Sequence, residues 1–372
     1  MSNVIQKLNG QGQSIWCDNL SRAMLDRGEL SRLIGLGVVG ITSNPTIFMN
    51  AIAGSEDYDA RIAALAATGL SSAEIYENLV LPDIVEAADL LRPVYDRTHG
   101  VDGFVSLEVN PHLAYDTAGT VSEARRLFGR VNRPNVFIKV PGTPEGVPAI
   151  ETLIGEGIHV NVTLIFARGL YEKVMLAYLN GLKRIVAAGG NPDKVASVAS
   201  FFVSRVDTLV DKLLVEKHPP HADISDLLGK AAVANARLAY ARFEVVFRPG
   251  GAFDALRAEG ARVQRPLWAS TSTKNPDYPA TKYVDELVAP QSVNTLPLAT
   301  IDAVLHEGRS AVSIHDDLPG ARAIFEQLAR LGIHLDAVTE KLLADGVAAF
   351  AKSYDELLAG IEQKRRRLRA AG

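Results

Sequence analysis

The sequence is poor in cysteine, in net charge and in long apolar runs, and each absence excludes a class of protein. Cys17 is the single cysteine among 372 residues, so an intramolecular disulfide and a cysteine-based zinc cluster are both excluded. The 39 lysine and arginine residues nearly balance the 43 aspartate and glutamate residues, which leaves a formal net charge of −4. This near-neutral balance gives no electrostatic reason to expect a nucleic acid or an anionic membrane as partner.

The chain also lacks the apolar segments that direct a protein to a membrane or hold it there. The N-terminus, MSNVIQKLNGQGQ, has no apolar core of the kind found in signal peptides. No apolar run approaches the roughly 18 residues that a membrane-spanning helix needs. We therefore expect a cytoplasmic protein with no membrane partner.

The spacing of the histidines gives no sign of a metal site. The eight histidines include no H-E-x-x-H pattern. His218-Pro-Pro-His221 has a suitable interval, but a proline turn does not present two ligands from one helix face. We therefore expect neither a metal nor another cofactor.

The composition is that of a globular protein with a large core. Hydrophobic residues make up 47% of the chain and charged residues 22%, which argues against disorder. No linker rich in proline, glycine or serine divides the sequence, and no internal repeat is visible. We predict a single domain over residues 1–372.

Eight short apolar runs recur along the chain, and each ends in a polar, glycine or proline turn. They lie at 14–19, 38–45, 103–111, 135–142, 159–166, 195–202, 265–272 and 292–297. Near-continuous apolar runs are typical of buried parallel strands. Amphipathic stretches separate them, among them 20–34, 121–129, 146–154, 170–188 and 224–247. Eight such units predict an α/β fold, a (β/α)8 or TIM barrel.

Three longer segments are predicted to add helices to this barrel. Helical insertions are expected at about 46–100 and 208–262, and a helical C-terminal extension at about 301–372. The one charge run, KRRRLR at 364–369, falls in the last turns of this extension. We expect it to be a solvated helix end, where cations suit the helix dipole.

Polar residues recur near the end of the predicted strands. Residues two apart share one face of a strand, and barrel active sites lie at the C-terminal strand ends. The faces expected to point inward carry Trp16 and Asp18, Thr42 and Asn44, Ser106 and Glu108, Phe137 and Lys139, Asn161 and Thr163, Val198, Ser200 and Phe202, Trp268 and Ser270, and Asn294. Packing alone does not explain such a ring, so we predict a catalytic pocket.

Lys139 is the most informative member of this ring. It lies in Phe-Ile-Lys-Val-Pro, with apolar residues on both sides. Burial disfavours the charged form of an amine, and a neutral amine can form a Schiff base with a carbonyl. Such a reaction needs proton donors and acceptors, for which Glu108, Asp18 and Thr163 are candidates without any metal. The alternative is a structural lysine that pairs with Glu108 or Asp18.

At these residues the chain resembles the transaldolase family. The matching stretches are Thr42-Ser43-Asn44-Pro45, Val105-Ser106-Leu107-Glu108-Val109, Ile138-Lys139-Val140-Pro141, Asn161-Val162-Thr163-Leu164, Ser200-Phe201-Phe202-Val203-Ser204-Arg205-Val206-Asp207 and Ala269-Ser270. Each stretch is weak alone, but their combination and order are specific. The resemblance implies a (β/α)8 barrel and a class I aldolase with its Schiff-base lysine on the fourth strand, where Lys139 falls. The C-terminal helices resemble the longer bacterial branch of the family.

The resemblance also implies a reaction, transfer of a dihydroxyacetone unit in the non-oxidative pentose phosphate pathway. Lys139 would attack C2 of sedoheptulose 7-phosphate or fructose 6-phosphate. Glu108 would act as acid and base through a water also held by Thr163, and Asp18 would take the C4 hydroxyl proton. An aldose phosphate, glyceraldehyde 3-phosphate or erythrose 4-phosphate, would collect the unit. The resemblance implies no cofactor, and sugar phosphates as partners of a monomer or homodimer.

The same resemblance assigns the substrate-binding residues. Asn44, Asn161 and Ser200 would bind the dihydroxyacetone hydroxyls, while Arg205 and Ser270 would hold the phosphate. Many family members carry an arginine shortly after the Ala-Ser of the seventh strand, and this chain has none there. Lys274 is the expected substitute, together with the Ser272 hydroxyl.

Phe202 bears on the choice between transfer and simple cleavage. The small fructose 6-phosphate aldolases resemble this family but carry a tyrosine near this place and release dihydroxyacetone. A phenylalanine, together with Glu108, favours transfer. A Schiff-base aldolase of that releasing kind, a metal-dependent aldolase or isomerase, and a catalytically silent binding barrel stay open as alternatives.

Overall fold

The computed structural model describes residues 2–217 and 224–371, and it shows a closed barrel of parallel strands. Each predicted apolar run contains one strand: β1 (Gln13–Asp18), β2 (Gly40–Thr42), β3 (Phe104–Glu108), β4 (Val136–Pro141), β5 (Val160–Ile165), β6 (Ser197–Phe202), β7 (Arg265–Ala269) and β8 (Ser292–Leu296). Each strand pairs with the next, and β8 closes the barrel on β1. The predicted fold class is confirmed. His218 and His221, which were considered as a metal-binding pair, lie outside the described residues.

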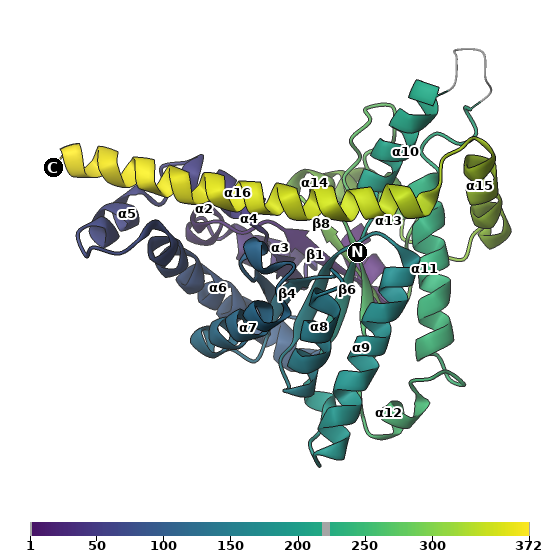
Figure 1. The fold of residues 1–372 in the computed structure, drawn as a ribbon, viewed down its shortest axis with the longest axis horizontal. Coiled ribbons are helices and arrows are strands. Elements are labelled where there is room, and N and C mark those ends of the chain that lie inside the picture. The colour runs from purple at the N-terminus through teal and green to yellow at the C-terminus, as the bar shows by residue number, and fades with distance from the viewer. Residues whose placement is uncertain (1, 218–223, 372) are drawn as a thin grey trace.

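Helices follow the strands and surround the barrel (Figure 1). They are α1 (Val4–Gly10), α2 (Arg22–Asp26), α3 (Glu29–Leu36), α4 (Pro45–Phe48), α5 (Asp59–Ala66), α6 (Ser72–Arg97), α7 (Thr117–Val131), α8 (Gly146–Gly155), α9 (Arg168–Ala187), α10 (Ser204–Lys217), α11 (Ala231–Phe247), α12 (Asp254–Ala258), α13 (Lys282–Asp285), α14 (Leu298–Glu307), α15 (Leu318–Arg330) and α16 (Leu335–Ala371). The helix expected at 20–34 is two helices, because Gly28 between them adopts a left-handed φ of 67°. None of the described helices is long and apolar enough to cross a membrane.

The strand register decides which side chains point into the barrel, and it corrects the prediction for β7. Ser200 of β6 pairs with Leu267, so Leu267 shares the inward face and Trp268 points outward. Trp268 packs against Tyr240 of α11, with ring centroids 6.4 Å apart. Ser270 still reaches the barrel mouth because its left-handed φ of 56° ends the alternation of the strand.

The prediction for β8 is wrong by one residue for the same reason. Trp16 of β1, which points inward, pairs with Thr295. Asn294 therefore points outward, where its amide donates to the Tyr283 carbonyl at 3.5 Å. Thr295 takes the inward position that the sequence analysis gave to Asn294.

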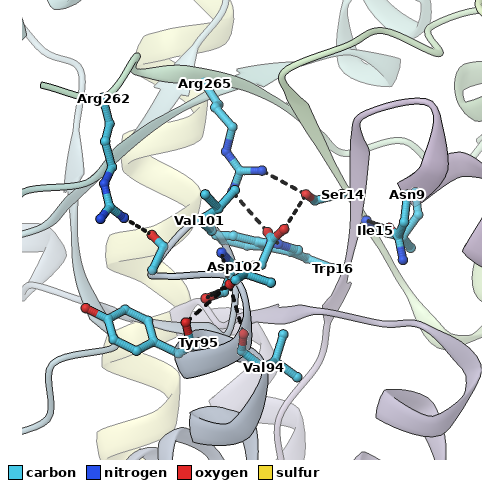
Figure 2. Close-up of polar contacts among 12 residues, drawn as sticks. Asn9, Ser14, Ile15, Trp16, Val94, Tyr95, Val101, Asp102, Arg262 and Arg265 are labelled. Carbon is cyan, nitrogen blue, oxygen red and sulfur yellow. Dashed lines mark hydrogen bonds and ion pairs between the residues drawn. The ribbon is translucent and has the colours of Figure 1, made fainter. Parts of the chain in front are cut away.

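A buried polar cluster closes the N-terminal end of the barrel (Figure 2). Arg265 at the start of β7 forms an ion pair with Asp102, with Nη2 3.0 Å from Oδ1. Asp102 also accepts hydrogen bonds from the Ser14 hydroxyl at 2.7 Å and the Trp16 indole at 3.0 Å. A side chain at Gly40 would meet the Trp16 ring at 2.6 Å, so this layer requires glycine on β2. Each charged group in this cluster has partners, as stability requires of a buried ion pair.

The last helix, α16, runs along the longest axis of the molecule (Figure 1) and packs against α4, α5, α6 and α10. The expectation of a solvated helix end at 364–369 is wrong for Lys364, which is buried and lies 2.5 Å from Asp59 of α5. Arg367 contacts the same carboxylate at 2.5 Å. Through these two contacts with Asp59, the charge run attaches the end of α16 to α5.

The polar cluster predicts an unequal response to two aspartate substitutions. Asp102→Ala should lower the free energy of unfolding by about 3–5 kcal/mol, because Arg265 would stay buried without its counter-charge. Asp96→Ala removes an exposed partner of Arg92, and it should cost less than about 1 kcal/mol. Urea unfolding of both variants measures the difference. Equal losses would contradict the role given to the Arg265–Asp102 pair.

Candidate active site

Lys139 and Glu108 meet near the C-terminal end of the barrel. They occupy register-paired positions on β4 and β3, with Nζ 3.5 Å from Oε2, and both side chains are at least nine-tenths buried. Lys139 Nζ also donates to the Ser43 carbonyl at 3.1 Å. This geometry fits both a catalytic lysine and a structural lysine paired with Glu108. The hydrogen bonding of the surrounding polar atoms distinguishes the two interpretations.

Glu108 lacks the full set of hydrogen bonds that a buried structural ion pair requires. Its Oε2 is buried and accepts no hydrogen bond within the described residues. Burial raises the pKa of the Glu108 carboxyl to about 7, which Asp18 assists and the nearby Lys139 opposes. A carboxyl group with such a pKa can both donate and accept a proton near neutral pH.

Asp18 ends β1 and accepts a hydrogen bond from Thr42, which in turn contacts Thr295. Thr42 Oγ1 donates to Asp18 Oδ1 at 2.7 Å and lies 2.7 Å from Thr295 Oγ1. Burial raises the pKa of Asp18, while Lys139, the Thr42 hydrogen bond and Lys274 oppose the rise. The sequence analysis placed Thr42 on the inward face without a role, and it missed Thr295 because of the error in β8.

A ladder of hydrogen bonds crosses the barrel beside Lys139. Asn161 on β5 donates from Nδ2 to the Ser106 hydroxyl at 3.0 Å and accepts from the Ser200 hydroxyl at 2.7 Å. These two contacts fix the orientation of the Asn161 amide. Thr163, two residues further along the inward face, has a buried Oγ1 with no hydrogen-bond partner in the part of the chain that the structure describes.

A cavity of about 240 Å³ opens above this ladder. It is lined by these predicted site residues: Asp18, Asn44, Lys139, Ser200, Phe202, Arg205, Ser270 and Lys274. Glu108, Asn161 and Thr163 are not part of its lining. Asn44 is held in place as the N-cap of α4, where its side chain accepts from the Ile47 amide at 3.0 Å.

Two cations face this cavity without a carboxylate partner. Arg205, in the first turn of α10, lies over the Phe202 ring at 5.5 Å, and burial lowers its pKa. Lys274 donates to the Ser272 hydroxyl at 2.6 Å, and burial and the Arg205 charge lower its pKa. Neither forms an ion pair within residues 2–217 and 224–371, so their charges are available to an anion.

Ser270 lies beside these cations in a strained backbone conformation. A left-handed φ of 56° is uncommon for a serine. The Ser270 hydroxyl is 2.9 Å from that of Ser204, and the Ser270 carbonyl accepts from the Ser204 amide. These contacts hold Ser270 at the cavity wall next to the start of α10.

The sequence analysis missed Phe350, which belongs to α16. This ring is buried, lines the cavity, and lies 5.8 Å from Lys139 Nζ. The apolar spacing of α16 predicts a helix with a buried face, but it does not tell which part of the barrel that face covers. No signal in the sequence therefore pointed to Phe350.

Comparisons with known proteins agree with this arrangement. The family model described as "Transaldolase/Fructose-6-phosphate aldolase" matches residues 15–361. The chain is 49% identical to a transaldolase of Acidothermus cellulolyticus over 374 residues, 99% of each chain. It is 48% identical to one of Thermobifida fusca over 366 residues, 98% of this chain and 99% of the relative. It is 44% identical to one of Trichodesmium erythraeum over 377 residues, 99% of each chain.

The pKa of Glu108 predicts a pH dependence of stability. Folding raises this pKa from about 4.3 in the unfolded chain to about 7. The protonated group therefore stabilises the fold below about pH 4, and this contribution is lost as the pH rises through about 7. Relative to Glu108→Gln, which does not titrate, the protein should lose about 3 kcal/mol between about pH 4 and pH 8. Urea unfolding at both pH values tests this, and parallel losses in the two proteins would contradict it.

Proposed function

Since the chain belongs to the transaldolase/fructose-6-phosphate aldolase family and its function is that of a transaldolase, we propose that the reaction runs through a Schiff base on Lys139. The observation that carries this proposal is the position of the buried Lys139 Nζ, 3.5 Å from Glu108 Oε2. Burial raises the pKa of that Glu108 carboxyl group to about 7. The substrates are sugar phosphates. The donor is sedoheptulose 7-phosphate or fructose 6-phosphate, and the acceptor is glyceraldehyde 3-phosphate or erythrose 4-phosphate.

The first steps join Lys139 to the ketose. The neutral amine attacks C2, the ketone oxygen takes a proton, and the carbinolamine then loses water to give a protonated imine. Glu108 donates and recovers these protons through a water that also contacts Thr163. Glu108 Oε2 and Thr163 Oγ1 support this role, because both are buried oxygens without a hydrogen-bond partner among the described residues.

Asp18 performs the next step. It takes the proton of the C4 hydroxyl, the C3–C4 bond breaks, and the bonding electrons pass into the protonated imine. The aldehyde half leaves, and the three-carbon enamine stays on Lys139. The Thr42 hydrogen bond holds the Asp18 carboxylate in place for this transfer. The acceptor aldehyde then enters, and the same steps in reverse release the new ketose.

The remaining site residues bind the substrate. Asn44, Asn161 and Ser200 contact the dihydroxyacetone hydroxyls near Lys139. Arg205, Ser270 and Lys274, with Ser272, hold the phosphate at the other side of the cavity, where two cations lack a carboxylate partner within the described residues. The Phe202 ring lies against the Arg205 guanidinium, whose Cζ is 5.5 Å from the ring centroid.

We further propose that the enzyme works in the cytoplasm as part of the non-oxidative pentose phosphate pathway. The similarity to transaldolases over nearly the whole chain supports the pathway assignment.

Borohydride trapping with fructose 6-phosphate tests the Schiff base directly. The unmodified enzyme should gain the mass of one reduced three-carbon unit, and peptide mapping should place it on Lys139. Lys139→Arg keeps a long basic side chain beside Glu108 but lacks the amine, so it should gain nothing. Lys282→Arg is the matched control, since Lys282 is a buried lysine that is paired with Glu286 and does not line the cavity. An adduct that persists in Lys139→Arg would overturn the mechanism.

Arg205→Ala tests the phosphate site. A charge-assisted hydrogen bond contributes about 1.5–3 kcal/mol, so KM for fructose 6-phosphate should rise about tenfold to hundredfold. Cleavage of unphosphorylated fructose should change far less. Arg168→Ala is the control, because Arg168 also lies over an aromatic ring, 5.2 Å from Phe325, but lines no part of the cavity. An equal loss for both substrates would argue against the assignment.

A further inference from the structure

Phe350 reaches the reacting lysine from a helix that is not one of the strand-to-strand connections of the barrel. The helix α16 follows β8 by way of α14 and α15, and it extends along the molecule (Figure 1). Of its buried side chains, Phe350 lines the cavity with Asp18, Lys139 and Arg205. Its ring lies 5.8 Å from Lys139 Nζ, and the side chain is 4% exposed. The ring therefore covers the nitrogen on which the Schiff base would form.

Contacts on either side of Phe350 fix the height of the ring above the barrel. One turn before it, a side chain at Gly346 would meet Leu164 Cδ2 at 3.0 Å and Arg205 Nη1 at 3.7 Å. Gly346 thus lets α16 approach β5 and the cation closely. One turn after it, the Ser353 hydroxyl lies 2.8 Å from that of Thr46, in the first turn of α4. The helix is held down over the cavity at both points.

The two aromatic rings of the cavity take different cations. Phe202 lies under Arg205 at 5.5 Å, at the proposed phosphate end. Phe350 lies over Lys139, at the proposed Schiff-base end. Phe202 therefore packs against the cation proposed to bind phosphate, whereas Phe350 covers the amine proposed to form the Schiff base.

This position matters for what happens after the donor is cleaved. The three-carbon enamine on Lys139 equilibrates with the protonated imine by taking a proton at C3. Water can then add to C2, a proton passes to the departing nitrogen, and the C2–N bond breaks to give free dihydroxyacetone and the amine. Transfer competes with this hydrolysis, because the acceptor aldehyde must arrive while the C2–N bond is intact. Any residue that keeps water from C2 favours transfer.

We propose that Phe350 is a positioning residue that shields the Lys139 adduct from water and so favours transfer over release of dihydroxyacetone. The ring offers no hydrogen-bonding atom to a water at C2, and its face stabilises a cation at Nζ. This inference rests on the proposed Schiff-base mechanism. It makes α16 a determinant of reaction outcome in addition to its packing role.

The measurement is the ratio of free dihydroxyacetone released to units transferred, with fructose 6-phosphate as donor and erythrose 4-phosphate as acceptor. Phe350→Ala opens the space above Nζ to water and should raise this ratio about tenfold, which corresponds to a fall of about 1.4 kcal/mol in the barrier to hydrolysis relative to transfer. Phe350→Leu keeps apolar bulk and should give an intermediate ratio. It also serves as the readable variant where Phe350→Ala fails to fold.

Leu357→Ala is the matched control. Leu357 is fully buried on the same helix, two turns further on, and it does not line the cavity. Its truncation should lower stability and leave the ratio unchanged. An unchanged ratio in folded Phe350→Ala and Phe350→Leu would overturn the proposal, as would an equal rise in Leu357→Ala, which would reflect general loosening of α16.

Borohydride trapping of the same proteins separates this inference from the mechanism on which it rests. An adduct on Lys139 in the unmodified enzyme and in the Phe350 variants, with a raised release ratio in the variants, supports both. An adduct with an unchanged ratio leaves the mechanism standing and removes the role of Phe350. Absence of an adduct in the unmodified enzyme removes the mechanism itself, and the role of Phe350 with it.

Discussion

The burial of Lys139 beside Glu108 is the constraint on which the rest of the site depends. A lysine and a glutamate taken from water into a barrel lose most of their hydration, and at 3.5 Å each moderates the other's charge. Burial raises the pKa of Glu108 to about 7, so its carboxyl group can be protonated near neutral pH. In the proposed mechanism this carboxyl group is the acid and base for Schiff-base formation on the neighbouring Lys139.

The two ends of the barrel each hold a buried ion pair, and the two pairs differ in how fully their carboxylate oxygens are hydrogen-bonded. At the N-terminal end, Asp102 holds Arg265, Ser14 and Trp16, so both of its oxygens are engaged. At the C-terminal end, Glu108 Oε2 lies within the barrel and accepts no hydrogen bond in the described part of the chain. Full satisfaction favours rigidity, whereas an unsatisfied buried oxygen is costly and is best explained by a substrate or water that it serves.

The eight strands and the polar residues near their ends were predicted from the apolar runs and the alternation along each strand, whereas Arg205, Ser272 and Lys274 were assigned from the resemblance to the transaldolase family. Lys139 and Glu108 were found by alternation along apolar runs, and register pairing then placed them side by side. The same alternation failed at Trp268 and Asn294, where the phase of a short strand rests on one residue and no local pattern fixes it. Phe350 could not be found this way, because its position depends on where a distant helix docks.

Two of the cations in the last turns of α16, Lys364 and Arg367, attach this helix to α5. Phe350 lies 14 residues before Lys364, about 21 Å along the helix. A helix held only near Gly346 could tilt about that point and move the ring away from Lys139. Lys364 and Arg367 on Asp59 fix the far end, and Thr46 with Ser353 fixes the middle. The charge run that resembled a solvated terminus thus acts as an anchor, and it helps to hold an aromatic ring over the Lys139 amine about 21 Å away along the helix.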